Sequence, residues 1–389
     1  MTQCTIIGIS DSRNQWLMPT VRDIIQCGKV FSGGKRHHDI MAPHLPDNAI
    51  WIDITVPLQE VFRQYKQYDD IIIFASGDPL FYGFAATVQR ECPGCDIKVY
   101  PSFHSLQSLA HAMCLPYHDM HVVSLTGRPW DKLDEALIQG WQLIGVLTDR
   151  THTPHAIHQR MMTYGYDNYD MTVGENLGNE LLQHIAPYDA THEYAVPNCI
   201  IMQKTADKRR HFGIPEEEFN LLDGRSRMIT KMPVRLLSLS MMDLHNRHSM
   251  WDIGFCTGSV SIEAKLQMPH LCITAFEKRQ EGRHLMESNT QRFGTPGINT
   301  VIGDFMQIDL QPYPRPDAVF IGGHGGELEK MLQRLHSVMQ PGCCIVFNAV
   351  KEENKIKFIR GVDSIGMKLT SCVRMAVDDH NPIYIMKAE

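Results

Sequence analysis

The fold of the second half of the chain is decided by residues 250–263, which read MWDIGFCTGSVSIE. An apolar run of strand type ends at Ile253, and Gly254 and Gly258 bracket a tight turn. Apolar residues then recur at helical spacing from Val260 onward. Strand, glycine turn and helix N-terminus together suit a nucleotide-like cofactor, because glycines let backbone N–H groups come close to the ligand. A glycine pair after a strand also occurs in plain turns, so this stretch alone leaves the simpler explanation open.

Acidic residues follow the predicted strands of this half. Residues 273–276 form the next predicted strand, and Glu277 follows it about 20 residues past the glycines, where a carboxylate binds ribose hydroxyls. Asp304 comes two residues after a third predicted strand and could accept from an adenine amino group. With Asp252, these acids stand at the carboxyl ends of strands, where open α/β sheets bind ligands. The alternative is that all three are solvated acids at loop starts.

The pattern resembles class I S-adenosylmethionine (SAM) methyltransferases, in which an acid stands two residues before the first glycine, as Asp252 does. The resemblance implies a Rossmann-like seven-stranded sheet that ends in an antiparallel hairpin. We expect the remaining strands at 318–321, 343–348, 368–376 and 383–386. The implied cofactor contacts are Asp252, Gly254, Cys256, Gly258, Glu277, Gly303 and Asp304.

Cys256 departs from the Gly-x-Gly-x-Gly form of this turn, because it stands where the middle glycine is expected. A left-handed backbone costs a residue other than glycine about 1 kcal/mol or more. We therefore expect weaker, but not absent, cofactor binding at this turn.

The composition describes a cytoplasmic protein of two or three domains. The chain has 389 residues, 43% of them hydrophobic, and a formal net charge of −7. An acidic balance disfavours wide contact with nucleic acid, whose binding surfaces are usually basic. Eleven cysteines, an odd number, indicate free thiols in a reducing compartment. The first ten residues form a strand pattern and not a signal peptide, and no apolar run is long enough to cross a bilayer.

The first half alternates strand and helix patterns, which is typical of a parallel α/β sheet. The predicted strands are 5–9, 29–32, 49–54, 70–75, 97–100, 122–125, 143–147, 169–173 and 194–203. The predicted helices are 17–27, 58–67, 81–91, 104–112, 130–139 and 154–164. Because the alternation of strand and helix patterns changes near residues 115–120, we predict two α/β subdomains, about 1–116 and 117–207.

The most specific motif of the first half is residues 74–83, FASGDPLFYG. Gly77 turns the chain after a buried strand, Asp78 suits a helix cap, and Pro79 suits the first helical position. A plain strand-to-helix connection explains part of this run. Several special residues within seven positions make it more specific than a single cap.

The run resembles the loop of tetrapyrrole methylases (class III SAM methyltransferases) that lines a cofactor cleft between two α/β subdomains. Residues 32–36 (SGGKR), 101–105 (PSFHS), 124–128 (SLTGR) and 174–178 (GENLG) carry further likeness, to the corrin C5-methylating branch. The implied cofactor contacts are Gly8, Gly77, Asp78, Pro79, Phe81 and Ser105.

The loop after the first strand departs from this family. Members often carry Gly-x-Gly-Pro there, whereas this chain has Gly8-Ile9-Ser10-Asp11. Since glycine permits close approach of the backbone, we expect this loop to lie farther from the cofactor or the tetrapyrrole.

A charged break at 205–218 separates the halves, and we predict domains 1–207 and 208–389. Residues 228–235, before a predicted helix at 236–244, resemble a segment that lies over the active site in corrin C15-methylating, decarboxylating class I enzymes. Without that likeness, Lys231 and Arg235 are equally well explained as exposed helix charges. With it, both are candidates for substrate positioning.

Acetate and propionate groups of a tetrapyrrole need Arg or Lys partners. The candidate substrate contacts are Lys35, Arg36, Arg128, Gly323, Asn348 and Arg374. The glycine loop 322–326 and Asn348 carry the likeness to the corrin enzymes.

Together the resemblances imply a fused enzyme that uses one SAM in each half. The first half would methylate C5 of a corrin precursor, and the second would methylate C15 and remove carbon dioxide from the ring C acetate. The predicted partners are a small tetrapyrrole and further copies of the chain, with no nucleic acid and no membrane. We expect no protein-bound metal, and His152, His155 and His158 are interpreted as an exposed helix face.

Two alternatives stay open. A SAM-dependent RNA methyltransferase is one, because relatives of both halves act on RNA. A SAM-binding scaffold without turnover is the other, supported only by the departures at Ser10-Asp11 and Cys256.

Overall fold

The computed structural model describes residues 2–225, 228–377 and 381–389, and the chain divides into two compact units. The N-terminal unit comprises the chain to Arg128, Trp141–Ile157 and Tyr169–Thr205. The C-terminal unit comprises Pro129–Gly140, His158–Asn168 and Ala206–Glu389. Two short segments of the first half thus belong to the second unit, which the sequence patterns did not indicate.

The N-terminal unit contains two five-stranded sheets, of which the first is wholly parallel with the order β3-β2-β4-β1-β5. Its strands are β1 (Gln3–Ile9), β2 (Val30–Gly33), β3 (Ile50–Asp53), β4 (Asp70–Ser76) and β5 (Asp96–Tyr100). The helices between them are α1 (Pro19–Cys27), α2 (Lys35–Met41), η1 (Ala42–His44), α3 (Leu58–Tyr65) and α4 (Phe84–Glu91).

Both faces of this sheet are covered by helices. Ile71 and Ile73 of β4 pack in one apolar cluster with residues of α3 and α4. Ile72 and Phe74 point the other way and pack with residues of α1 and α2. A strand buried on both faces carries apolar residues without alternation, which is why 71–74 read as a continuous apolar run.

The second sheet has the order β6-β7-β10-β8-β9, and only the β6–β7 pair is parallel. Its strands are β6 (His121–Ser124), β7 (Leu143–Leu147), β8 (Tyr169–Glu175), β9 (His184–Pro187) and β10 (Asn198–Lys204). The helices of this region are α5 (Ser105–Ala112), α6 (Asp131–Gln139) and α7 (Pro154–Thr163). Leu106 and Leu109 of α5 pack with Cys199 and Ile201 of β10, so this helix belongs to the core of the second sheet.

The C-terminal unit is a seven-stranded sheet with the order β13-β12-β11-β14-β15-β17-β16. Its strands are β11 (Ser249–Ile253), β12 (Cys272–Glu277), β13 (Ile298–Ile302), β14 (Ala318–Ile321), β15 (Cys344–Ala349), β16 (Leu369–Met375) and β17 (Ile383–Ala388). Its helices are α8 (Met232–Met241), α9 (Ser259–Gln267), α10 (Glu281–Phe293), α11 (Leu328–Val338) and α12 (Glu352–Ser364), with short turns η2 (Glu216–Glu218) and η3 (Leu244–Asn246).

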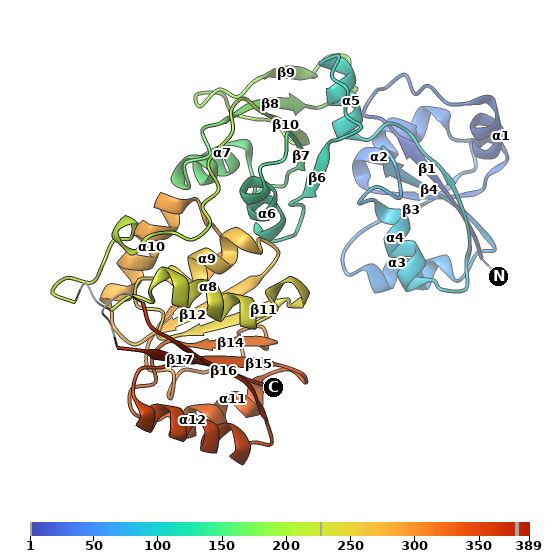
Figure 1. Cartoon of the computed structure of the whole chain (residues 1–389). Helices are drawn as coiled ribbons and strands as arrows, with labels where there is room; N and C mark the ends of the chain where they lie inside the picture. The colour runs from blue at the N-terminus through green and yellow to red at the C-terminus, as the bar shows by residue number, and fades with distance from the viewer. Residues whose placement is uncertain (1, 226–227, 378–380) are drawn as a thin grey trace. The chain divides into compact units, whose positions relative to one another are not determined.

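The last two strands of this sheet pair antiparallel and the first five pair parallel, as predicted. Helices α8 and α9 lie on one side of the sheet, and α11 and α12 on the other (Figure 1). The predicted fold class, α/β with a Rossmann-like second half, is confirmed.

Two predicted helix starts are wrong. Helix α4 begins at Phe84 and not near residue 81, because Tyr82 has φ of 52° and interrupts the helical backbone. Asp78 therefore caps no helix, and its Oδ1 instead accepts a 2.9 Å hydrogen bond from the N–H of Leu80. Helix α8 begins at Met232 and not at residue 236, with Pro233 in its first turn, a position where proline is favoured.

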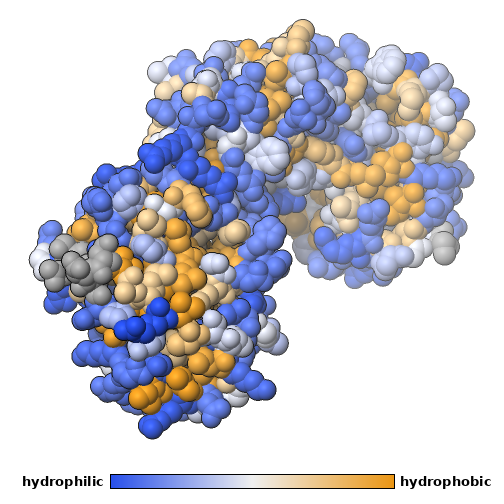
Figure 2. Space-filling view, in the orientation of Figure 1, coloured by the Kyte–Doolittle hydropathy of each residue, from blue (hydrophilic) through white to orange (hydrophobic). Residues whose placement is uncertain are grey.

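On the face that Figure 2 shows, the surface of each unit is mostly hydrophilic and carries scattered apolar patches. The largest exposed fractions among big apolar side chains belong to Leu181, Trp16, Val56 and Phe212. No described helix has the length and apolar content that crossing a membrane requires.

Candidate active sites

A cavity of about 610 Å³, here called the C-terminal cavity, opens at the carboxyl ends of the parallel strands of the second unit. It is lined by loops that follow β11, β12, β13, β14 and β15, and by residues 228–231. Its volume lies in the range of about 300–1,000 Å³ that is usual for small-molecule sites. The predicted residues that line it are Lys231, Gly254, Cys256, Glu277, Gly303, Asp304, Gly323 and Asn348.

The glycine turn after β11 has the left-handed backbone that its sequence predicts. Gly254 and Gly258 both have φ of 76°, and Cys256 has φ of 51°. A Cβ on Gly254 would lie 2.6 Å from the backbone nitrogen of Gly323, so the two loops approach too closely for any other residue. Cys256 thus occupies the strained conformation that its position suggested, with its Sγ 3.1 Å from the carbonyl oxygen of Met228.

Glu277 lines the cavity beside this turn. Its Oε2 accepts from the N–H of Cys256 at 3.0 Å, and its Oε1 accepts from the N–H and Nη1 of Arg279 at 3.0 and 3.1 Å. A carboxylate has about four acceptor positions, so one remains for a hydroxyl donor. Thr257 also lines the cavity, and its buried Oγ1 has no hydrogen-bond partner among the described residues. These groups fit the ribose and methionine parts of SAM.

Asp304 also lines the cavity, two residues beyond β13, the strand that pairs with β12. Its Oδ2 is 2.8 Å from Nζ of Lys278, and its Oδ1 accepts from the N–H of Met306 at 3.0 Å. The hydrogen bond from Lys278 and that from Met306 lower the pKa of Asp304. An ionised acceptor at this position fits an adenine amino group.

Asp252 does not line the cavity. Its side chain is fully buried, its Oδ2 accepts from Ser261 Oγ at 2.6 Å, and its Oδ1 has no partner in the described chain. Burial raises the pKa of this carboxyl to about 7. Asp252 ties β11 to α9 below the turn, and Gly258 likewise packs against Met286 instead of facing the cavity.

Arg235, predicted to position substrate, is also fully buried and does not line the cavity. Its Nε lies 3.3 Å from Oε2 of Glu263, Nη1 donates to the carbonyl oxygen of Thr230 at 2.9 Å, and Nη2 donates to that of Ile214. Its guanidinium holds Ile214 and Thr230 against α8 and α9. Arg374, on the edge strand β16, is exposed and lies outside the cavity lining.

A second cavity, here called the N-terminal cavity, has a volume of about 520 Å³ and lies within the first unit. Loops of the first sheet and the ends of β7, β8 and β10 line it. Of the predicted residues, Arg36, Gly77, Phe81 and Ser105 line this cavity, whereas Lys35, Gly8, Asp78, Pro79 and Arg128 do not.

In the loop after β1, Ser10 and Asp11 both line the N-terminal cavity, and the distance of this loop from a bound cofactor or tetrapyrrole stays a prediction. A Cβ on Gly8 would lie 1.8 Å from the carbonyl oxygen of Gly77, so Gly8 lets β1 and the 74–83 motif touch. Beyond Gly8, the chain reaches the cavity lining at Ser10 and Asp11.

The walls of the N-terminal cavity combine flat rings with polar groups. Phe81 stacks on His104 with ring centroids 3.8 Å apart, and burial lowers the pKa of His104 to about 4. Arg36 lies 3.4 Å from Asp11 and donates to Ser76 Oγ at 2.9 Å. Burial, and secondarily Arg36, lowers the pKa of His37 to about 4.

Arg128 contacts the ring of Tyr82 at 5.2 Å and donates to Ser124 Oγ at 2.9 Å, beside the cavity and not in its lining. The three histidines near α7 are not the exposed helix face that was predicted. His152 is buried against Asp149, and His155 and His158 are half-buried.

Sequence comparison matches both halves of the chain to families. Residues 4–188 match a model described as tetrapyrrole (corrin/porphyrin) methylases, and residues 222–388 match one described as precorrin methyltransferase domain. A cobalt-precorrin-6B C(15)-methyltransferase (decarboxylating) of Salmonella typhimurium is 33% identical over 162 residues, 42% of this chain and 83% of the relative. The chain belongs to the precorrin methyltransferase family. It is a methyltransferase, and the family implies the use of SAM.

Similarity to another member of the family spans both halves. A precorrin-6Y C(5,15)-methyltransferase [decarboxylating] of Sinorhizobium sp is 27% identical over 353 residues, 89% of this chain and 84% of the relative. A solved precorrin-6Y C5,15-methyltransferase structure from Geobacter metallireducens is 33% identical, covers 46% of this chain and 97% of its own, and has a TM-score of 0.42.

Several cavity residues were missed by sequence reasoning. They are Ser10, Asp11, His37, His104, Thr257, Lys278, Arg279 and His324. Most stand within a few residues of a predicted glycine or acid, so the neighbours of each motif were the available signal. The missing information was which side chains turn toward the cavity.

Proposed function

We propose that the chain methylates precorrin-6B or cobalt-precorrin-6B at C5 and C15 and decarboxylates the ring C acetate, as a precorrin-6Y C5,15-methyltransferase (decarboxylating) of cobalamin biosynthesis. The observation that carries this proposal is the presence of two separate cavities, each at strand ends of a differently built methyltransferase fold. Residues 1–207 are assigned C5 methylation, and residues 208–389 are assigned C15 methylation with decarboxylation.

Each cavity is proposed to bind one SAM, which supplies an already activated sulfonium methyl. In the C-terminal cavity, Glu277 would accept from the ribose and Asp304 from the adenine, while the turn at Gly254 brings backbone N–H groups near the ligand. In the N-terminal cavity, Gly77, Phe81 and Ser105 are the proposed cofactor contacts.

Methyl transfer to a conjugated macrocycle asks little acid–base chemistry of the protein. The ring supplies a carbon nucleophile, so catalysis rests on holding two carbons in line and excluding water. Lys231 lines the C-terminal cavity as a half-buried cation, and Lys278 and Arg279 line the same cavity. We assign these cations to the acetate and propionate groups of the substrate.

Loss of carbon dioxide leaves an electron pair that the conjugated imines of the macrocycle accept. The protein then has to orient the ring C acetate and keep its neighbouring carboxylates bound. Gly323 and Asn348 line the same cavity. Asn348 is held by a 3.0 Å hydrogen bond from its Nδ2 to Ser238 Oγ, which fixes its amide for substrate contact.

Arg36 is the proposed carboxylate partner in the N-terminal cavity. Its pairing with Asp11 and Ser76 positions the guanidinium at the lining. His37 and His104, whose pKa values burial lowers, stay neutral near pH 7 and add no positive charge there.

The test uses the full chain with SAM and either precursor, followed by mass spectrometry of the products. The proposal expects two added methyl groups and the loss of carbon dioxide. Glu277→Ala should abolish C15 methylation and decarboxylation and leave C5 methylation. Gly77→Ala, whose Cβ would lie 2.7 Å from Cα of His104, should do the reverse. Absence of methyl transfer to either precursor, or transfer to RNA instead, would overturn the proposal.

We further propose a cytoplasmic homo-oligomer with no resident catalytic metal. The exposed neighbours Leu181 and Leu182 support association, since large apolar side chains rarely stay open to water in groups. Light scattering of the purified chain tests it, and a mass of one chain at micromolar concentration would contradict it.

A further inference from the structure

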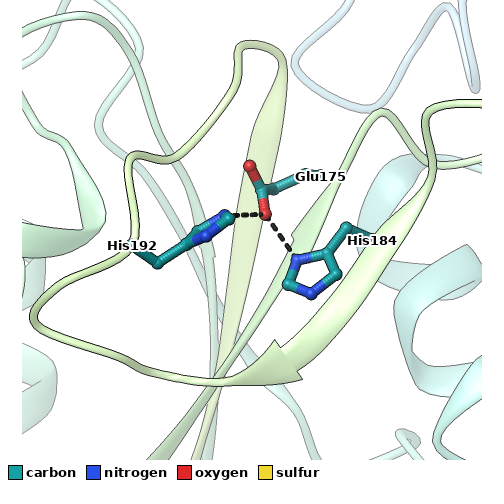
Figure 3. A group of neighbouring side chains, drawn as sticks. All are labelled: Glu175, His184 and His192. Carbon is teal, nitrogen blue, oxygen red and sulfur yellow. Dashed lines mark hydrogen bonds and ion pairs between the residues drawn. The ribbon is translucent and has the colours of Figure 1, made fainter.

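Three metal-binding side chains meet in the N-terminal unit, outside the cavity lining. Glu175 ends β8, His184 begins β9, and His192 lies in the loop between β9 and β10. Nδ1 of His184 lies 2.7 Å from Oε2 of Glu175, and Nε2 of His192 lies 2.8 Å from the same oxygen. Figure 3 shows both imidazole rings directed at this one carboxylate. Within the described residues, this is the one group of three such side chains with ligand atoms within 4.8 Å of one another.

The carboxylate of Glu175 is buried without a permanent cation. Its side chain is 3% exposed, and its ion-pair partners in the described chain are His184 and His192, with no Arg or Lys. A buried carboxylate normally pairs with a cation or binds a metal. An imidazole carries a positive charge only when it is protonated. A divalent cation would supply it.

The three groups are arranged as a ligand set and not as a chance cluster. Glu175 and His184 are directly opposed in the antiparallel β8–β9 pair, which puts their side chains on one face. Oε1 of Glu175 accepts from the N–H of Ala195, which leaves Oε2 to face the rings. The backbone carbonyl of His192 accepts from Nε2 of His155 at 2.9 Å, so the loop that carries this ligand is anchored.

We propose that Glu175, His184 and His192 bind a Zn²⁺ ion that fastens β9 and the loop after it to β8. Two imidazoles and one carboxylate form a set that zinc uses with water in the remaining position. Zinc ligands lie about 2.1 Å from the metal and hence roughly 3.3 Å apart, so the rings must withdraw by about half an ångström. The side chains of His184 and His192 are 51% and 37% exposed, which gives them room to move and gives the ion a path from solvent.

The site would shape the N-terminal cavity without contacting its ligand. Gly174, immediately before Glu175, lines that cavity, and so do Pro197 and Asn198 at the end of the loop that carries His192. A metal that joins β8 to this loop therefore fixes one wall of the cavity. Because the metal contacts no reacting atom, its role is structural.

In the experiment, the full chain is first treated with a chelator, which is then removed. The metal-free chain is titrated with ZnCl₂ by calorimetry, and its metal content is measured after dialysis. The proposal expects one Zn²⁺ per chain in the wild type and none in the double variant His184→Ala/His192→Ala. His118→Ala is the matched control, because His118 is a 79% exposed histidine outside the cluster. Zinc binding by the double variant at wild-type stoichiometry would overturn the proposal.

A second measurement does not depend on the variants folding. The chelated wild-type chain is titrated with Co²⁺, and its absorption spectrum is followed. A four- or five-coordinate site gives intense ligand-field bands that Zn²⁺ abolishes by displacement, and this is the expected result. A spectrum identical to that of aqueous Co²⁺ would mean that Glu175, His184 and His192 only form hydrogen bonds with one another, and it would overturn the proposal.

Discussion

The backbone N–H of Cys256 donates a 3.0 Å hydrogen bond to Oε2 of Glu277, which makes the turn after β11 and the acid after β12 one connected structure. Any change in the turn is therefore transmitted to the carboxylate that is proposed to bind the ribose. The hydrogen bond helps to orient the carboxylate whose remaining acceptor position is proposed for a ribose hydroxyl.

Cys256→Gly should strengthen cofactor use in the C-terminal half. Cys256 has φ of 51°, a conformation that costs a residue with a Cβ about 1 kcal/mol or more, and glycine also lets the ligand approach the backbone. We expect the KM for SAM in C15 methylation to fall about fivefold, the equivalent of about 1 kcal/mol.

The control for this experiment is Cys256→Ala, which removes the thiol and keeps the strain. Its KM should match that of the wild type. If glycine and alanine give the same KM, the backbone conformation at this turn does not limit binding.

Asp252 should make the C-terminal unit less stable as the pH rises. Burial raises the pKa of its carboxyl to about 7 in the folded chain, above the value of about 3.9 in an unfolded chain. The folded state therefore binds more protons between these values, and stability from this group is present at acidic pH and lost as the pH rises through about 7.

Asp252→Asn removes that titration while it keeps a neutral polar side chain. We expect the melting temperature of the variant, measured calorimetrically between pH 5 and pH 8, to fall less than that of the wild type. Asp363→Asn, at an exposed aspartate of α12, should keep the wild-type slope. Parallel curves for the wild type and Asp252→Asn would contradict the assignment.

Much of the fold was readable because the central strands β1, β4, β11 and β14 are buried on both faces. Runs such as 71–74 and 318–321 carry apolar residues without interruption, and their ends are marked by glycine or acid. The short strand β9, His184–Pro187, was missed because only Ile185 and Ala186 are apolar and its pairing with β8 supplies the order. A strand that depends on its partner carries little local signal.

Site residues could be predicted from the sequence where their role depends on backbone conformation. They were harder to predict where the role depends on the direction in which a side chain points. Gly254 and Gly77 could be identified from the sequence as turn glycines. The structure gives the reason, because a Cβ at either position would clash with the neighbouring loop. Arg235 was assigned to substrate positioning because residues 228–235 resemble a segment that lies over the active site in corrin C15-methylating enzymes. Its burial against Glu263 depends on residues 28 positions apart and cannot be read from local spacing.

Substitutions of Lys231 and Arg235 should have different effects, the first on activity and the second on stability. Lys231 lines the C-terminal cavity, so Lys231→Ala should lower kcat/KM for C15 methylation at least tenfold with an unchanged melting temperature. Arg235→Ala leaves the buried Glu263 without its cation, a loss of about 3–5 kcal/mol for a buried pair. It should lower the melting temperature and reduce activity only through the fraction of folded chain.

The measurement for this pair combines calorimetry with C15 kinetics at a temperature where both variants remain folded. Arg235→Ala should then recover most of the wild-type kcat/KM, whereas Lys231→Ala should not. An Arg235→Ala variant that is folded at this temperature but has lost turnover would return Arg235 to the substrate site.

Gly8→Ala should disable the N-terminal cavity and spare the C-terminal one. The added Cβ would lie 1.8 Å from the carbonyl oxygen of Gly77, a backbone atom that cannot yield as a flexible side chain would. Overpacking of this kind costs about 1–3 kcal/mol or more and separates β1 from the 74–83 motif. We expect C5 methylation to fall at least a hundredfold while C15 methylation stays within twofold of wild type. Gly94→Ala is the matched control, because a Cβ there meets nothing within 4 Å. Equal loss of both methylations in Gly8→Ala would show that the two cavities do not act independently, since the strain lies wholly within the first sheet.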